Sequence, residues 1–379
     1  MNILFFSSYF HPYISGITTY PLKLFSHLVN KYQITVLTFK HDQNLESKEK
    51  IKDLKIIRMP FLFKLSKGFI SLRSVLYFSQ YARKNDLIIL NIPNAEGFLL
   101  VLIAKLFKKK VLLIYHCQVF LDGSLFNQII NKILNLSVSC QLKMSDQIIF
   151  YTKDYFNSLK SLKKYRYKTK FVFPPVSKLA VDKNYLSDLI AKKNKKTWIG
   201  FAGRVAREKG IEYLIKALSR LDKKNFALIF AGPFAKQVVG EEAYYQSIVR
   251  QLERSKIEYY FLGLLKGKKL GAFYKAIDVL VLPSINQTEA FGMVQVESVF
   301  SGTPVIASNL AGVRQVIKRT KMGLLVSKAN EEELAKAVQR VLKNKERYAN
   351  NRLIRNAEKI FDENKNYRFY ENLIEKMMK

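Results

Sequence analysis

The sequence is poor in cysteine and lacks long apolar runs. Its 379 residues include two cysteines, Cys117 and Cys140, which excludes a disulfide framework and fits a reducing compartment. The longest apolar stretch, residues 97–107, is interrupted by Lys105 and is far shorter than the roughly 20 residues that cross a bilayer. The opening residues, MNILFFSSYF, have no basic segment before their apolar run, which argues against a signal peptide. We therefore expect a cytoplasmic protein that is at most peripheral to a membrane.

Acidic residues are also scarce, with 30 Asp and Glu against 64 Lys and Arg and a net charge of +34. Residues 1–175 hold 26 basic and 9 acidic side chains, and the remainder holds 38 and 21, so each half carries +17. The charge belongs to the whole molecule and calls for a polyanionic partner or neighbour. A hydrophobic fraction of 49% rules out a disordered chain, and the length favours two domains.

Short, apolar, β-rich runs alternate with segments of helical period along the whole chain, a pattern typical of buried parallel sheets. A polar, Lys-rich stretch at 177–196 interrupts the pattern and is interpreted as a linker. The sequence thus predicts an α/β fold with two Rossmann-like domains, residues 1–176 and 197–363, facing each other across a cleft. The predicted strands are 2–8, 33–39, 55–60, 86–92, 110–116, 146–152, 170–174, 198–203, 226–232, 257–263, 278–284, 303–308 and 323–327.

Ligands of open parallel sheets bind in the loops at the carboxyl ends of the strands, and two such loops are rich in glycine. Gly16 follows the first strand, where it would let the backbone approach a ligand, although an ordinary turn explains this loop equally well. The loop 203–210 begins and ends with glycine and holds Arg204, Arg207 and Lys209 before a helix. These cations could clamp a diphosphate, with solvated surface charge as the alternative.

Two further loops hold isolated ionisable residues. Glu289 and Glu297 are the only charged residues between Asp278 and Arg314. On one helix they would lie roughly 12 Å apart along its axis, which is too far for a glycosidase carboxylate pair but suits two ends of a long ligand, with two solvent-facing helix glutamates as the alternative. His116 ends a predicted strand, where it could bond a hydroxyl or carry a proton, or could be structural. No His, Cys or Asp spacing suggests a metal site.

In combination, these motifs resemble the retaining, nucleotide-sugar-dependent glycosyltransferases of the GT-B fold, family four. The glycine loop, the strand-end His116, the Gly203–Gly210 loop and the E-x7-E motif from Glu289 to Glu297 occur in the order typical of that family. Many relatives have two adjacent glycines in the first loop, where this sequence has Ser15 before Gly16. The resemblance covers nearly the whole chain and is strongest over residues 198–328.

The resemblance implies roles for particular residues. Arg204 and Lys209 would hold the donor diphosphate in place of the divalent metal that other transferases use, so no metal or other cofactor is expected. Glu289 would contact hydroxyls of the donor sugar, and His116 would reach its primary hydroxyl from the N-terminal domain. The residues implied to bind the rest of a UDP- or GDP-hexose are Gly16, Gly203, Gly263, Leu264, Phe291, Gly292 and Glu297.

The resemblance also implies front-face displacement with retention, in which a donor phosphate oxygen accepts the proton of the acceptor hydroxyl. This mechanism explains why the sequence shows no dedicated base. The last helix, about 364–379, is expected to pack back on the N-terminal domain, as it does in GT-B relatives.

The acceptor is expected to be a lipid-linked or cell-envelope glycan, with the enzyme peripheral on the inner face of the cell membrane. Residues 54–85 contain seven basic residues and no acid, interleaved with aromatic residues, and residues 160–170 add six more. Each cation near an anionic leaflet contributes about 1 kcal/mol. The alternatives are a Lys-rich solvated surface, a GT-B enzyme with a soluble acceptor such as a sugar-phosphate synthase and, remotely, a nucleic-acid-binding protein. Only the charge favours the last, and nucleic acid is not an expected partner.

Overall fold

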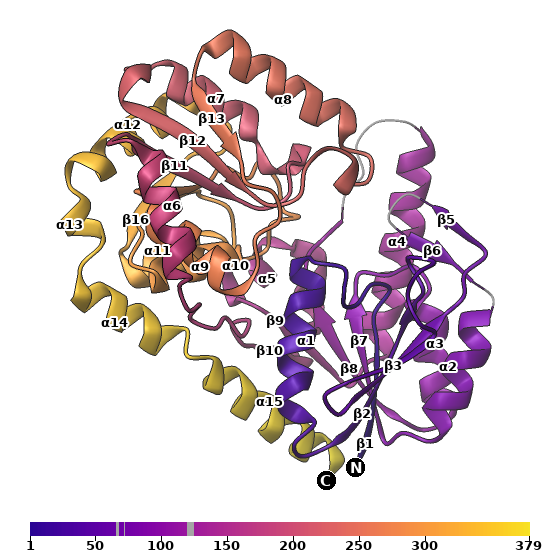
Figure 1. Cartoon of the computed structure of the whole chain (residues 1–379). Coiled ribbons are helices and arrows are strands. Elements are labelled where there is room, and N and C mark those ends of the chain that lie inside the picture. Colours follow the sequence, from indigo (N-terminus) through magenta and orange to yellow (C-terminus); the bar gives the residue numbers. More distant parts are fainter. Residues whose placement is uncertain (66–67, 72, 120–124) are drawn as a thin grey trace. The chain divides into compact units, whose positions relative to one another are not determined.

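The computed structural model describes every residue except 66–67, 72 and 120–124 (Figure 1). The chain divides into two compact units, Met1–Pro175 with Glu363–Lys379 and Val176–Asp362. Each unit is built on one mainly parallel sheet with helices on both faces. The predicted α/β fold with two Rossmann-like domains is confirmed.

The first unit contains an eight-stranded sheet in which all neighbouring strands are parallel except the edge pair β3–β4. Every residue of its central strand β7 is buried, because helices cover both faces. A separate two-stranded hairpin lies outside this sheet. In sheet order the strands are β10 (Thr169–Phe171), β9 (Gln147–Phe150), β8 (Lys110–Tyr115), β7 (Leu87–Ile92), β1 (Asn2–Phe6), β2 (Gln33–Phe39), β4 (Leu54–Met59) and β3 (Lys48–Ile51), and the hairpin strands are β5 (Phe63–Leu65) and β6 (Gly68–Ile70).

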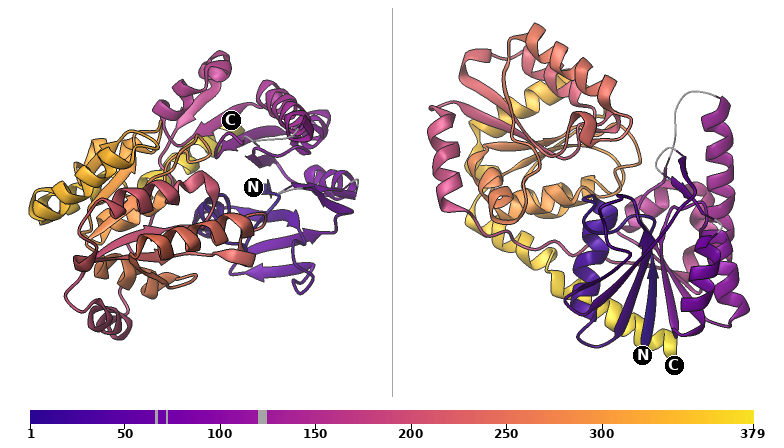
Figure 2. Two further views of the ribbon diagram at one scale, coloured as in Figure 1. Left: turned by 90° about the horizontal axis from the view of Figure 1, so that it is seen from above. Right: turned by 45° about the vertical axis from the view of Figure 1, so that its right-hand side comes forward.

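Helices α2, α3 and α4 cover one face of this sheet, and α1 lies with α15 on the other (Figures 1 and 2). The helices lie on both faces because right-handed crossovers run from β1 toward opposite edges of the sheet. The helices of this unit are α1 (Gly16–Leu28), α2 (Arg73–Arg83), α3 (Gly97–Leu106), α4 (Leu125–Met144), α5 (Lys153–Ser158), the 3-10 helix η1 (Lys160–Lys168) and α15 (Glu363–Met378).

Helix α15 is held against α1 by polar contacts. The hydroxyls of Tyr20 and Tyr370 lie 2.5 Å apart in a buried hydrogen bond. Lys31 Nζ donates to Glu375 Oε1 at 2.5 Å near the surface. The C-terminal segment is therefore part of the first unit, although the second unit separates it in sequence from residues 1–175.

The second unit contains a six-stranded, wholly parallel sheet. An apolar cluster lies between the sheet and helices α7, α8 and α12. In sheet order the strands are β13 (Glu258–Phe261), β12 (Phe226–Ala231), β11 (Thr197–Ala202), β14 (Val279–Leu282), β15 (Val305–Ser308) and β16 (Gly323–Val326). The helices are α6 (Lys183–Lys193), η2 (Arg207–Lys209), α7 (Ile211–Ser219), η3 (Lys223–Asn225), η4 (Ala235–Gln237), α8 (Glu242–Ser255), α9 (Gly267–Ala276), α10 (Met293–Phe300), α11 (Arg314–Thr320), α12 (Glu331–Lys343), α13 (Lys345–Tyr348) and α14 (Asn351–Ile360).

The stretch 177–196, which the sequence suggested to be a linker, contains helix α6 and packs as part of the second unit. The Asp182 side chain caps this helix by accepting a hydrogen bond from the Tyr185 amide. Leu189 is buried, and Lys193 pairs with Asp278 at 2.5 Å. The lysines that suggested a linker lie mainly on the exposed face of α6, whose apolar side is narrow.

Within the described part of the chain, no helix combines the length and the apolar character needed to cross a membrane.

Candidate functional site

The loop after β11 is drawn close to the loop after β12 by two glycines. Gly203 has φ +144° and donates its amide to the Ala231 carbonyl at 2.9 Å. Gly232 has φ +146°, and a Cβ at this position would collide with the Gly203 carbonyl. A side chain at position 232 would separate the loops, and the positive φ of both positions is one that residues other than glycine rarely adopt.

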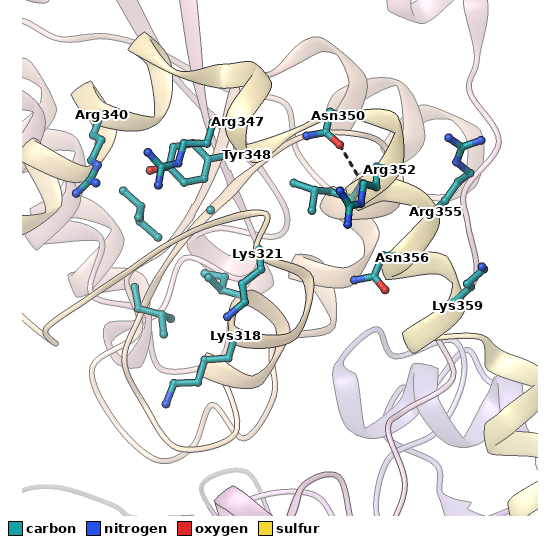
Figure 3. A pocket seen from close by; sticks show the side chains of 15 residues that line it. Lys318, Lys321, Arg340, Arg347, Tyr348, Asn350, Arg352, Arg355, Asn356 and Lys359 are labelled. Atoms are coloured by element: carbon teal, nitrogen blue, oxygen red, sulfur yellow. Dashed lines mark hydrogen bonds between the residues drawn. The ribbon is translucent and has the colours of Figure 1, made fainter.

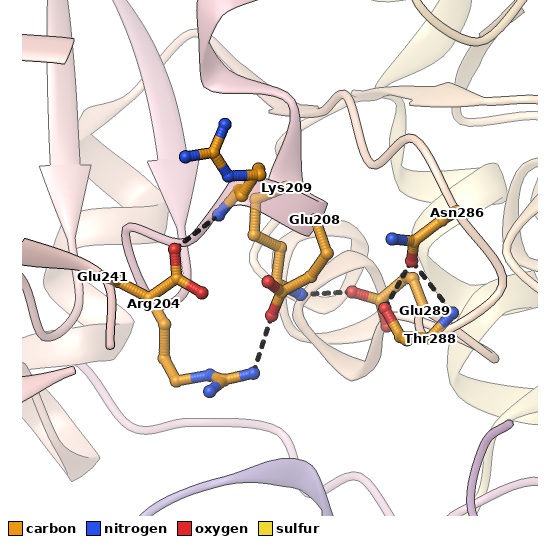
Figure 4. A network of polar contacts seen from close by, with 8 residues as sticks. Arg204, Glu208, Lys209, Glu241, Asn286, Thr288 and Glu289 are labelled. Carbon is orange, nitrogen blue, oxygen red and sulfur yellow. Dashed lines mark hydrogen bonds and ion pairs between the residues drawn. The ribbon is translucent and has the colours of Figure 1, made fainter. Parts of the chain in front are cut away.

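The predicted phosphate clamp is an alternation of cations and carboxylates (Figure 4). Arg204 Nη2 donates to Glu208 Oε1 at 2.8 Å, and Lys209 Nζ forms an ion pair with Glu289 Oε2. The Lys209 and Glu289 side chains are only 16% and 14% exposed. Their mutual attraction is therefore stronger than that of a surface pair, since less water screens it.

Lys209 meets Glu289 across 80 residues because their two loops are packed together. Gly210 has φ +63°, and a Cβ there would collide with the Pro283 carbonyl at the end of β14. The Ile285 amide donates to the Glu208 carbonyl at 3.1 Å. The two motifs that the sequence singled out separately therefore form one polar site at the carboxyl edge of the sheet.

The two glutamates of the E-x7-E motif do not share a helix. Helix α10 begins at Met293, and Glu289 lies in the preceding turn, which Asn286 stabilises by accepting from the Thr288 amide at 3.0 Å. Gly292 caps the start of this helix with φ +77°, a left-handed conformation. The helix therefore does not extend back to Glu289, and the spacing expected from the sequence for one shared helix does not apply. Glu297 alone is helical.

Glu297 is a half-buried carboxylate that accepts a hydrogen bond from the Tyr274 hydroxyl at 2.8 Å. Burial of Tyr274, together with the neighbouring carboxylate, raises the pKa of this hydroxyl far above its ordinary value. Tyr274 therefore remains a hydrogen-bond donor and fixes the orientation of Glu297.

The other predicted donor-binding residues also lie at the carboxyl edge. Gly263 follows β13, has φ +72°, and has no atom within 4 Å of where a Cβ would project. Its neighbour Leu264 is 41% exposed. Phe291 has a buried ring, so this position and Gly292 offer a ligand their backbone at the start of α10.

In the first unit, His116 directly follows β8 and is buried. Its Nδ1 shares a hydrogen bond with the Tyr151 hydroxyl, and its Nε2 has no partner among the residues that the structure describes. Burial lowers the pKa of His116 to about 3, so the ring is neutral at physiological pH. A neutral ring with one unused nitrogen suits a hydrogen bond with a sugar hydroxyl.

Gly16 is the first residue of α1, and the turn before it is fixed by local hydrogen bonds. The Ser15 amide donates to Thr18 Oγ1 at 3.0 Å, and Thr18 Oγ1 donates to the Tyr13 carbonyl at 2.6 Å. Ser15 has φ −162°, an extended conformation that any residue adopts. The serine in place of the usual first glycine therefore causes no backbone strain.

The structure brings Arg204, Lys209 and Glu289 into one contact network in the second unit, whereas His116 and Gly16 lie in the first unit. Sequence reasoning missed Glu208, although it stands in the same loop as Arg204. It also missed the hydroxyl of Ser284, which is buried after β14 and has no hydrogen-bond partner in the described part of the chain.

Comparison with known proteins agrees with the two-domain fold. Solved structures of similar fold include sucrose-phosphate synthase from Thermosynechococcus elongatus, with a TM-score of 0.76 and 20% identity over 98% of this chain and 99% of that one. Anabaena HepE in complex with UDP-glucose has a TM-score of 0.79 and 18% identity over 99% of this chain and 100% of that one. The chain therefore has the GT-B fold.

Residues 183–360 match the family described as Glycosyl transferases group 1, and this match covers nearly the whole second unit. An uncharacterized glycosyltransferase of Methanocaldococcus jannaschii is 36% identical over 154 residues, 40% of this chain and 37% of that protein. The 2-deoxystreptamine glucosyltransferase of Streptomyces kanamyceticus is 30% identical over 146 residues, 38% of this chain and 36% of that protein. The matched segments span less than two fifths of these relatives. The expected resemblance to GT-B glycosyltransferases is confirmed.

Proposed function

We propose that the protein is a retaining glycosyltransferase that moves a hexose from a nucleotide-diphosphate sugar to an acceptor hydroxyl. The observation that carries this proposal is the half-buried Lys209–Glu289 pair beside Arg204, on loops packed together by Gly210. An arriving diphosphate can take the place of the two glutamates as partner of Lys209 and Arg204, because its oxygens form charge-assisted hydrogen bonds with both cations. Glu289, once released, is free to accept hydrogen bonds from sugar hydroxyls.

The chemistry follows from where charge develops. As the bond between the sugar C1 and the donor phosphate oxygen lengthens, negative charge grows on the diphosphate and positive charge on the sugar ring. Lys209 and Arg204 stabilise the first, and the Glu289 carboxylate is suited to the second. The departing phosphate oxygen takes the proton of the acceptor hydroxyl as the new C1–O bond forms on the same face.

His116 and Glu297 have positioning roles in this proposal. His116 Nε2 offers the sugar a neutral hydrogen-bonding group, and Glu297, held by Tyr274, offers a carboxylate to the ribose hydroxyls. The two cations supply the positive charge for the leaving group, so the reaction is proposed to be metal-independent.

The donor is tested by thermal unfolding with UDP, GDP, ADP, CMP and their common sugar conjugates in the presence of EDTA. A ligand at 100 times its Kd stabilises the protein by about 2.7 kcal/mol, which is readily measured. Stabilisation by one nucleoside diphosphate and its sugar, lost in Lys209→Ala, supports the proposal. No stabilisation by any of them contradicts it.

For the acceptor, we propose a lipid-linked or envelope glycan and docking at an anionic bilayer. The support is an apolar face on α3 and α4, two helices that pack side by side in the first unit. Leu106 and Leu136, for example, are 71% and 67% exposed. The exposed apolar residues of this face are Phe98, Leu99, Leu102, Leu106, Leu125, Phe126, Ile129, Ile133 and Leu136.

The charge around this face complements an anionic surface. Asp122 is the only acidic residue between Glu96 and Asp146, a stretch that includes six lysines. Apolar side chains that enter the interface and cations that meet lipid phosphates act together, at about 1 kcal/mol for each cation. The basic stretch 54–85 includes α2, which packs against α3, and residues 66–67 and 72 of this stretch lie outside the described residues.

Vesicle flotation with phosphatidylcholine, with and without phosphatidylglycerol, tests the docking. Leu106→Glu with Ile133→Glu should abolish flotation with the anionic vesicles, and both side chains are exposed, so the fold should persist. Ile190→Glu, an exposed apolar residue of α6, is the matched control. Unchanged flotation of the double variant contradicts docking through this face. If the double variant still floats but changes from dimer to monomer, the face joins two copies of the chain, and the proposed docking is likewise contradicted.

A GT-B enzyme with a soluble acceptor is the second candidate, because the fold neighbours include a sucrose-phosphate synthase. Release of the nucleoside diphosphate in the presence of soluble sugars and sugar phosphates, compared with lipid-linked acceptors, distinguishes the two.

A further inference from the structure

The second unit contains a cavity of about 1160 Å³ that no part of the proposed transfer reaction uses. It lies between α11, the edge strand β16, the end of α12, and helices α13 and α14 (Figure 3). We call it the basic cavity. Its charged lining residues are Lys318, Lys321, Arg340, Arg347, Arg352, Arg355 and Lys359.

The basic cavity has no acidic lining residue in the described part of the chain. Glu358, on α14, pairs with Lys178 and is not among the lining residues. The arginines at 347, 352 and 355 are exposed, and none of them forms an ion pair with a carboxylate of the described residues. Their positive charge is therefore uncompensated, which leaves a strongly positive potential inside a concave surface.

Apolar side chains complete the wall beneath these cations. Leu324 and Leu325 come from β16, and Leu353 comes from the first turn of α14. The Asn356 side chain, also on α14, adds an exposed amide to the lining. A concave site with an apolar wall and a few convergent polar groups is typical of small-molecule sites.

The basic cavity is separate from the donor site of the same unit. Lys321 and Gly323 stand at the amino end of β16, whereas Arg204 and Glu289 follow the carboxyl ends of β11 and β14. In a wholly parallel sheet these ends are opposite edges. A ligand in one site does not compete directly for the residues of the other.

We propose that the basic cavity binds a ligand that carries two or more phosphate groups. Arginine presents a planar fork that binds phosphate oxygens in pairs, and four of the seven cations are arginines. They come from α12, α13 and α14, with the lysines on α11, after it and at the end of α14, so a single phosphate cannot contact them all. The same chemistry is available in a soluble phosphorylated molecule and in a phospholipid headgroup.

The probe is inorganic tripolyphosphate, titrated into the full chain by calorimetry at fixed salt. The triple variant Arg347→Gln, Arg352→Gln, Arg355→Gln should bind it at least about tenfold more weakly, because three charge-assisted contacts are lost. The matched control removes the same charge from exposed positions elsewhere in the unit, as Lys224→Gln, Arg250→Gln, Arg254→Gln, and should change the Kd less than about twofold. Equal weakening in both variants overturns the site.

Two further arms separate this site from the donor site and distinguish the ligand sources. Tripolyphosphate can also enter the donor site, so the titration is repeated in Lys209→Gln with Arg204→Gln. Binding should persist in that variant and should weaken at least about tenfold when Arg347→Gln, Arg352→Gln and Arg355→Gln are added. Loss of all binding in Lys209→Gln with Arg204→Gln alone overturns the proposal. The variant Arg347→Lys, Arg352→Lys, Arg355→Lys keeps the charge. Its tripolyphosphate affinity should lie between those of the wild type and the triple glutamine variant. Competition by vesicles that contain cardiolipin, whose headgroup carries two phosphates, identifies a headgroup site, and binding that the vesicles do not displace identifies a soluble ligand.

Discussion

The two units treat the carboxyl edges of their sheets in opposite ways. At the edge of the second sheet, Arg204 and Lys209 are charged and each is paired with a glutamate. At the carboxyl ends of the central strands β1, β7 and β8 in the first sheet, the polar groups of Ser7, Asn91 and His116 are neutral: Asn91 donates to Ser7 Oγ at 3.1 Å, and the His116 ring is uncharged. The comparison indicates that the second unit is suited to a charged diphosphate and the first to uncharged hydroxyls.

The difference has a simple electrostatic origin. Lys209 and Glu289 retain some exposure and neutralise each other, so their charges survive partial burial. His116 is packed against the aromatic ring of Tyr20, with ring centres 5.7 Å apart, and among the described residues no carboxylate contributes to its pKa shift. A protonated imidazole there would be an uncompensated buried charge, so burial keeps it neutral.

The largest expected effect comes from the charged edge. Lys209→Ala and Glu289→Ala should each reduce sugar transfer by about 10²–10³-fold, since each removes a group that faces developing charge in the transition state. The measurement is release of the nucleoside diphosphate from the donor that the thermal panel identifies.

Lys216→Ala, an exposed lysine of α7, is the matched control and should retain the full rate. Each alanine leaves one partner of the pair unbalanced but still partly solvated, so the unfolding transition should remain cooperative. A near-normal rate in either Lys209→Ala or Glu289→Ala would contradict the site assignment.

The neutral edge should instead be detected as a pH dependence of stability. The folded pKa of His116, about 3, lies below its unfolded value of 6.5, so the unfolded state binds the proton first as the pH falls. The stability is complete above pH 6.5 and is lost toward pH 3, by about 2 kcal/mol at pH 5. Urea unfolding of the wild type and His116→Gln at pH 5 and pH 7 measures it.

His116→Gln should lose less stability than the wild type between these pH values, because glutamine does not titrate. Equal losses in the two proteins would show that His116 is not neutral by burial.

The carboxyl of Glu96 sharpens the comparison, since it follows β7 at the same neutral edge. Both of its oxygens are buried without a partner in the described part of the chain, and burial raises its pKa to about 8. The folded value exceeds the unfolded one of 4.5, so the stability that this group contributes is present at low pH and is lost as the pH rises through 8. Glu96→Gln should raise the stability at pH 8 by up to about 4 kcal/mol and leave it unchanged at pH 4. Thermal unfolding at both pH values checks this, and destabilisation at pH 8 would mean that the carboxylate has a partner.

Much of the fold could be predicted from the sequence, because continuous apolar strands such as β7 indicate a buried parallel sheet. Each of the thirteen predicted strands overlaps an observed one. Strand β3, with the sequence KEKI, was missed because it pairs at an exposed edge and lacks an apolar run. Helix α6 was not predicted because it is rich in lysine and buries only Leu189, so its apolar periodicity is weak.

The site was predictable residue by residue but not as a geometry. The motifs carried Arg204, Lys209 and Glu289, whereas the pairing of Lys209 with Glu289 depends on Gly210 fitting against the end of β14. The neutral state of His116 comes from packing that no local pattern encodes. The basic cavity gathers cations from segments spread over residues 318–359, where the sequence showed only a general excess of charge.

The smallest expected effect concerns how α15 supports the neutral edge. Tyr370 donates or accepts one hydrogen bond with Tyr20, whose ring packs at 5.7 Å against His116 and at 5.4 Å against Tyr151. Tyr370→Phe removes that bond and leaves the packing, so it should cost about 0.5–1 kcal/mol of stability. Because Tyr20 lies between α15 and His116, the same variant should weaken donor-sugar binding slightly and leave the affinity for the nucleoside diphosphate alone unchanged. Thermal shifts with the two ligands separate these effects, and an equal loss for both would mean that α15 supports the fold without orienting His116.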